Sequence, residues 1–196
     1  MFLLGNVLFS IVNDFSFDDF CFRILEELAL FGNRHLRELA ERLKMPASTV
    51  FKSLQKLESK GIVRSARQKN RKVFSINYDS SLANNALRLL MTQKILGCKN
   101  FKALEGLKPS AIILFGSSAS GKISPQSDID IALFFKGKPE VFKISEVKMA
   151  MESELGREIQ MISFSAERLD SLKKENKELY NQIHYKGIVL SGEMIE

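Results

Sequence analysis

Hydrophobic residues in the first third of the chain recur every three to four positions, which is the spacing of helices that bury one face. Three such stretches predict helices over residues 20–31, 36–43 and 50–57. Ser16, three residues before Asp19, has the spacing of an N-cap for the first of these helices. We therefore expect the chain to begin with a small helical domain.

After Gly61 the pattern changes from helical spacing to two runs that are typical of strands. Residues 62–67 and 71–78 are rich in β-branched and alternating residues, and the polar segment Gln68–Asn70 joins them. This arrangement predicts a β-hairpin directly after the third helix.

Positive charge gathers on the third helix and the hairpin. The chain has 29 Lys and Arg residues against 23 Asp and Glu, a formal net charge of +6. The stretch from Arg42 to Lys72 holds ten basic residues and one acid, Glu58. Because Val50, Leu54 and Leu57 take the apolar side of the third helix, its polar side is left for solvent or a polyanion.

The segments Leu36–Ala40, Ser48–Val50 and Leu57–Val63, followed by the basic hairpin, resemble the winged helix-turn-helix of transcriptional regulators. The resemblance implies binding to double-stranded DNA, with the third helix in the major groove and the hairpin on the phosphates. The candidate DNA contacts are Ser48, Thr49, Lys52, Lys56, Arg67, Lys69, Arg71 and Lys72. A winged helix that makes only protein contacts remains an open alternative.

A second apolar pattern links this domain to the rest of the chain. Residues 81–96 and 101–107 have helical spacing and predict one or two connecting helices. Their apolar stripe must be buried against a neighbouring domain or a second copy of the chain, so a homodimer is expected.

The remaining sequence bears on the compartment. Cys21 and Cys98 cannot build a disulfide framework, which favours a reducing, cytoplasmic location. The apolar run 1–12 is shorter than the roughly 20 residues of a membrane span, so no membrane partner is expected. We expect this run to form a hairpin turning at Gly5–Asn6 or part of a dimer interface.

Candidate chemistry lies in the second half, between two apolar runs. Ala111–Phe115 predicts a strand buried on both faces, and Gly116 and Ser117 follow it. Asp128 and Asp130 open the next run and, being two residues apart on a strand, point to the same side about 7 Å apart. Two such carboxylates suit a magnesium ion that also binds phosphate oxygens.

The segments Gly116–Gly121 and Pro125–Asp130 resemble the nucleotidyltransferase superfamily that includes DNA polymerase beta. They are similar to its minimal nucleotidyltransferases, some of which are antitoxins that transfer AMP to a partner toxin. The resemblance implies Mg²⁺ or Mn²⁺ on Asp128 and Asp130 as the catalytic carboxylates. It also implies a nucleoside triphosphate held by Gly116, Ser117, Ser118, Lys122 and Ser127.

Two positions depart from that family's pattern. Gln160 stands where a third carboxylate is expected, and an amide cannot take up a proton or supply negative charge. Ser118 and Ser120 stand where arginines beside the triphosphate are common, and Lys122 is the available replacement. Whether the site transfers a nucleotide or binds it without turnover is therefore open.

The expected architecture is an α/β (α+β) chain of two domains. A winged helix-turn-helix over residues 1–79 and a helical connector over 80–108 precede a small mixed-sheet nucleotidyltransferase-like domain over 109–196. Two functions fit this plan. One is a DNA-binding regulator that binds a nucleoside triphosphate and magnesium; the other is an active transferase of AMP or another NMP to a hydroxyl of a protein, such as a toxin, or of a small molecule.

Overall fold

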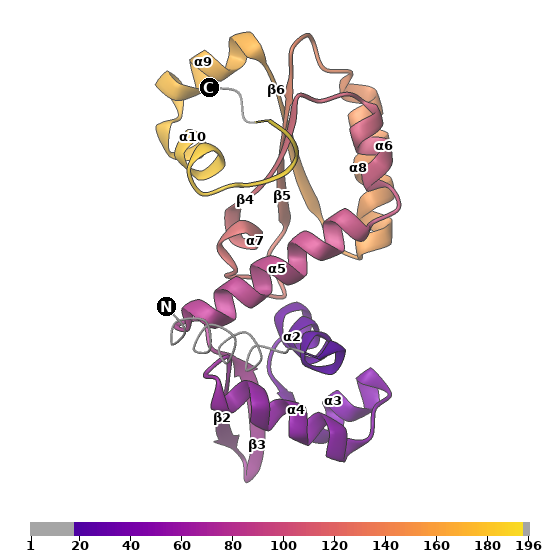
Figure 1. Ribbon diagram of the computed structural model, residues 1–196, viewed down its shortest axis with the longest axis vertical. Coiled ribbons are helices and arrows are strands. Elements are labelled where there is room, and N and C mark those ends of the chain that lie inside the picture. Colours follow the sequence, from indigo (N-terminus) through magenta and orange to yellow (C-terminus); the bar gives the residue numbers. More distant parts are fainter. Residues whose placement is uncertain (1–17, 194–196) are drawn as a thin grey trace, which may run out of the picture. The chain divides into compact units, whose positions relative to one another are not determined.

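The computed structural model describes residues 18–193, apart from the side chains of residues 166–170 (Figure 1). The chain forms two compact units, and the boundary between them in the sequence lies between Asn77 and Tyr78. The hairpin expected over residues 1–12 lies outside the described residues. Along the described part, no helix combines the length and the hydropathy that crossing a bilayer requires.

Within residues 18–77, the first unit consists of three helices and a small antiparallel sheet of strand order β1-β3-β2. The helices are α2 (Asp19–Phe31), α3 (Leu36–Leu43) and α4 (Ala47–Ser59), and the strands are β1 (Arg34–His35), β2 (Val63–Gln68) and β3 (Arg71–Ile76). This is the winged helix that the sequence predicts, with one short additional strand.

The core of the first unit follows the apolar periodicity. Val50, Leu54 and Leu57 of α4 are completely buried, as the spacing predicts. The N-cap of α2 is Asp18, whose carboxylate accepts a hydrogen bond from the backbone N–H of Cys21 at 2.8 Å. The expectation of Ser16 in this role was wrong because Asp18 directly precedes the first helical residue and satisfies the free N–H itself.

The hairpin tip is tighter than the sequence suggests. Gln68 pairs with Arg71, so the turn consists of Lys69 and Asn70, both in the left-handed region with φ of 45° and 64°. Positive φ at both central residues is the conformation of a type I′ turn, which matches the twist of the two strands. The turn therefore presents Lys69 at the extreme tip of the wing.

The second unit is a mixed four-stranded sheet of order β6-β5-β4-β7 with helices on both faces. Strands β5 and β6 run parallel, and the other two pairings are antiparallel. The strands are β4 (Ala111–Phe115), β5 (Ile129–Phe135), β6 (Ile159–Ser165) and β7 (Ile188–Gly192). The helices are α5 (Ser81–Gly97), α6 (Phe101–Gly106), α7 (Gly116–Ser120), α8 (Val141–Leu155), α9 (Ala166–Glu175) and α10 (Lys177–His184).

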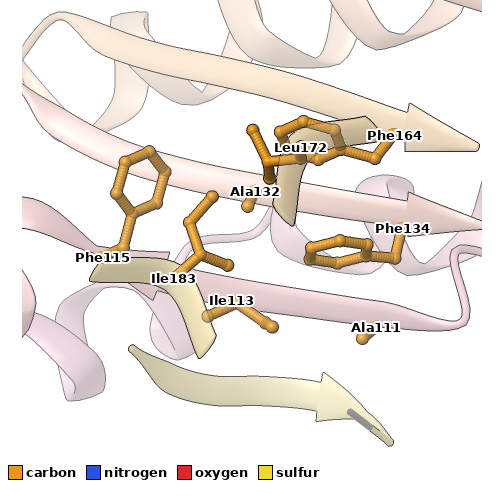
Figure 2. Close-up of a cluster of buried hydrophobic side chains, with 8 residues drawn as sticks. All are labelled: Ala111, Ile113, Phe115, Ala132, Phe134, Phe164, Leu172 and Ile183. Atoms are coloured by element: carbon orange, nitrogen blue, oxygen red, sulfur yellow. The ribbon is translucent and has the colours of Figure 1, made fainter. Parts of the chain in front are cut away.

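The two faces of this sheet are covered by different helices. Figure 1 shows α9 and α10 on one side of the sheet and α6 and α8 on the other. All five residues of β4 are buried, as expected of a strand covered on both faces. On the α9 and α10 side, Phe134 and Phe164 stack with ring centroids 5.3 Å apart beside Leu172 and Ile183 (Figure 2).

The helices α5 and α6, which occupy the stretch expected to be a connector, pack within the second unit. A Cβ on Gly121 would lie 2.0 Å from the backbone oxygen of Asn84, so α5 lies directly against the end of α7. Glu154 of α8 connects that helix to the segment that leads into α6. Its carboxylate accepts hydrogen bonds from the thiol of Cys98 at 3.0 Å and from the backbone N–H of Lys99 at 2.7 Å.

We expect Glu154→Gln to lower the melting temperature at neutral pH. Hydrogen bonds from Cys98 and Lys99 lower the pKa of Glu154 from 4.5 to about 2. A lowered pKa stabilises the fold above pH 4.5, and this contribution is lost as the pH falls towards 2. Scanning calorimetry at several pH values should therefore show the gap between the two proteins closing over that range. Glu146→Gln, on the exposed side of the same helix, is the matched control; an equal effect of both variants would contradict the assignment.

Candidate functional site

Asp128 and Asp130 lie at the N-terminal end of β5, an inner strand of the second unit's sheet. Asp130 pairs in register with Phe115 of β4 and with Gln160 of β6, which places it between two strands. Burial raises the pKa of Asp130, and the negative charge of Asp128 raises it further. The two carboxylates are thus close enough to interact, as their spacing on a strand predicts.

Gly116 makes room for one of these carboxylates. A Cβ built on Gly116 would lie 2.1 Å from Oδ2 of Asp130 and 2.9 Å from its Cγ. The φ of Gly116 is 66°, a conformation that residues with side chains rarely adopt. The sequence predicts close approach of a phosphate to this glycine, whereas in the structure the group that approaches it is Asp130.

Gln160 occupies the third position of the site. It lies beside Asp130 in the parallel register, and its Nε2 donates a hydrogen bond to Oδ2 of Asp128 at 3.0 Å. Glu158 is exposed directly before β6, two residues before Gln160, and its backbone oxygen accepts a hydrogen bond from the backbone N–H of Ile129. Gln160 therefore fixes the orientation of a carboxylate but does not add a third negative charge.

The donor set fits a magnesium ion whose shell is completed by phosphate oxygens and water. No cluster of three His, Cys, Asp or Glu side chains suited to a metal is found among the described residues. Magnesium is commonly held through one or two carboxylates together with substrate phosphates, so Asp128 and Asp130 meet that requirement.

The expected nucleotide contacts on α7 and the following turn are placed unequally. Ser117 is partly exposed and Lys122 is exposed, so both can reach a bound phosphate. Ser118 is 1% exposed, because it lies on the side of the short helix that packs into the fold. The hydroxyl of Ser127 is engaged within the turn, 3.0 Å from the backbone nitrogen of Ser124.

The solvent side of α4 differs in part from the expected DNA-contacting set. Ser48 and Lys52 are exposed, whereas Thr49 is half-buried. The ammonium group of Lys56 is half-buried, 3.6 Å from the carboxylate of Asp18. Phe51, which precedes Lys52, is 41% exposed.

Gln55 is a further exposed residue of α4 that sequence reasoning missed. It follows Ser48 by seven residues and Lys52 by three, so a helical projection of the three would have placed them together. The side-chain amide of glutamine can accept a hydrogen bond from adenine N6 and donate one to N7, which makes Gln55 a candidate for base contact.

The wing presents all four expected cations to solvent, namely Arg67, Lys69, Arg71 and Lys72. Lys72 also donates a hydrogen bond to the carboxylate of Glu58 at 2.9 Å. Together with a hydrogen bond from Ser65, this interaction lowers the pKa of Glu58. Glu58, the one acid of the basic stretch, thus forms an ion pair with Lys72 of the wing.

Family models match both units. Residues 17–72 match the MarR family, and residues 99–193 match the polymerase beta nucleotidyltransferase family. A search of curated proteins found no match.

Several solved structures are similar over about half of the chain. A MarR family regulator from Neisseria meningitidis is 18% identical over 52% of this chain and 72% of its own, with a TM-score of 0.38. A toxin–antitoxin structure with AMP-PNP is 25% identical over 53% and 74%, with a TM-score of 0.39. A tri-AMPylated HEPN toxin in complex with MNT antitoxin from Shewanella oneidensis is 22% identical over 54% and 73%, with a TM-score of 0.34.

The two family matches agree with the two compact units and with the order of their elements. The chain therefore combines a winged-helix unit that is similar to the MarR family with a mixed-sheet unit that is similar to the polymerase beta nucleotidyltransferases.

Proposed function

We propose that this protein is a DNA-binding transcriptional regulator whose nucleotidyltransferase domain binds a nucleoside triphosphate together with magnesium. The observation that carries the nucleotide half is the packing of Asp130 against Gly116, beside Asp128. Two neighbouring carboxylates repel each other, one of them partly buried, and a bound cation offsets that cost.

Each residue of the site has a separate task in this proposal. Asp128 and Asp130 hold the magnesium ion, and Gln160 keeps Asp128 oriented through its amide. The exposed Ser117 and Lys122 bind the phosphate oxygens. The metal, when bound, neutralises the negative charge of the phosphates.

Binding is favoured over transfer because of Gln160. Attack of a hydroxyl on the α-phosphate requires the hydroxyl proton to leave, and the amide of Gln160 cannot accept it. Loss of one such electrostatic or proton-accepting group costs about 10²–10³ in rate in comparable sites. Binding through Asp128 and Asp130 does not depend on that proton.

DNA binding is supported by the charge and exposure of the first unit. Arg67, Lys69 and Arg71 of the wing are exposed to solvent and positively charged. The exposed face of α4 adds Lys52. The helix would read base edges while the wing neutralises phosphates.

Calorimetry with ATP, GTP, CTP and UTP, each with and without Mg²⁺, tests the nucleotide half. We expect one or more nucleotides to bind in a magnesium-dependent manner, and Asp130→Asn to weaken that binding about 100-fold or more. Glu158→Gln removes an exposed carboxylate from the neighbouring strand and should leave affinity unchanged.

The same proteins distinguish binding from transfer. Incubation with α-labelled nucleotide and a bacterial lysate should leave the label unincorporated. Label that appears on a protein with the wild type and disappears with Asp128→Ala would establish nucleotide transfer to a protein, such as a toxin, in place of binding alone. Absence of nucleotide binding by the wild type would refute the proposal for this domain.

A further inference from the structure

The turn that leads into Asp128 is held together by serine side chains. The backbone nitrogen of Ser127 donates to the oxygen of Ser124 at 3.0 Å, and the hydroxyl of Ser127 lies 3.0 Å from the backbone nitrogen and from the hydroxyl of Ser124. One residue later the chain reaches Asp128, and β5 begins at Ile129. The geometry of this turn therefore sets where the first carboxylate of the site is placed.

Arg157 holds this turn from a distant part of the sequence. It lies between α8 and β6, and its Nη2 donates to the backbone oxygens of both Ser124 and Ser127, the first at 2.7 Å. A second guanidinium nitrogen, Nη1, is buried and has no hydrogen-bond partner among the described residues. The guanidinium thus connects the two ends of the turn and is turned away from solvent.

The surroundings of Arg157 combine burial with a nearby negative charge. Burial lowers the pKa of Arg157, and the negative charge of Asp128 opposes that effect. The hydroxyl of Tyr78 donates to the backbone oxygen of Ile123, one residue before the turn. Side chains from outside the turn therefore bond to Ser124 and Ser127 within it and to Ile123 just before it.

We propose that Arg157 is a positioning residue of the nucleotide site: it fixes the 124–127 turn and thereby holds Asp128 where magnesium is bound. This inference rests on the proposed nucleotide function for its consequence. Its Nη2 is engaged by the two backbone oxygens of the turn and its Nη1 is buried, so we assign its action to Asp128 and not to direct contact with the ligand. A carboxylate displaced by about 1 Å loses much of its value as a ligand.

Amide hydrogen exchange tests the placement of the turn without any ligand. Arg157→Gln should speed exchange at Ser124 and Ser127, whose amides are bonded within the turn, by about tenfold or more. The exchange in β4 should not change. Arg88→Gln makes the same substitution on α5, where the guanidinium contacts Asn85, and serves as the control.

Nucleotide calorimetry then tests the consequence. Arg157→Gln should weaken the magnesium-dependent binding about tenfold and leave binding of the metal-free nucleotide unchanged, because that binding does not use Asp128. Arg157→Lys, which retains a charged donor, should recover part of the loss.

The outcomes separate the inference from the function on which it rests. Unchanged exchange in the turn of Arg157→Gln would overturn the inference even if the wild type binds no nucleotide. A loss of metal-free binding that exceeds the loss of magnesium-dependent binding would also overturn the inference, since it would make Arg157 a phosphate ligand. So would an equal fall of both kinds of binding together with the melting temperature, which indicates a structural role alone. Faster exchange together with loss of only the magnesium-dependent binding supports it.

Discussion

Gly116→Ala is expected to abolish magnesium-dependent nucleotide binding, with a loss of about 100-fold or more by calorimetry. The added Cβ would lie 2.1 Å from Oδ2 and 2.9 Å from Cγ of Asp130, so that carboxylate would have to move. The substitution also forces alanine into a φ of 66°, which costs about 1 kcal/mol by itself. Gly137→Ala is the matched control, because a Cβ there meets no atom within 4 Å.

A double variant distinguishes the clash with Asp130 from the backbone strain that alanine has at position 116. In a protein that already carries Asp130→Ala, the group nearest to the new Cβ is absent, and Gly116→Ala should lower the melting temperature less than in the wild type. An equal loss in both backgrounds would show that the strained φ, and not the carboxylate, makes Gly116 necessary. Retained nucleotide affinity in a folded Gly116→Ala protein would contradict the site as described.

Local patterns predicted most of the second unit's site, because its parts lie on one strand and at the end of another. Two residues of separation put Asp128 and Asp130 on one face wherever that strand lay in the sheet. The function of Gly116 was not predictable in the same way. Its conflict with Asp130 depends on the antiparallel register of β4 and β5, which pairs Phe115 with Asp130.

Contacts between elements distant in sequence account for the remaining differences. Arg157 is 30 residues from Ser127, and its hydrogen bond to that turn follows from the parallel pairing of β5 and β6. Lys72 was assigned to the DNA surface from its charge, but the fold brings it to Glu58, 14 residues away. A charge pattern gives the sign of a surface, whereas the pairing of individual charges needs the tertiary structure.

The other large effect is expected on the wing. Replacing Arg67, Lys69 and Arg71 together with alanine should weaken binding to duplex DNA strongly and reduce its dependence on salt. Each phosphate contact adds about 0.9 to the slope of log affinity against log salt, so loss of three lowers the slope by about 2.7. Fluorescence anisotropy with a labelled duplex, from 50 mM to 200 mM salt, measures both quantities at once.

Position and net charge can be separated because the chain offers a second set of exposed cations. Replacing Lys102, Lys136 and Lys138 of the second unit with alanine lowers the net charge by the same three units. If the wing makes the phosphate contacts, this control changes the salt slope little while the wing variant changes it greatly. Equal slopes for the two triple variants would mean that DNA responds to overall charge, and the wing would lose its assignment. Lys72 is left in place in both variants because its removal would expose the charge of Glu58 to the DNA.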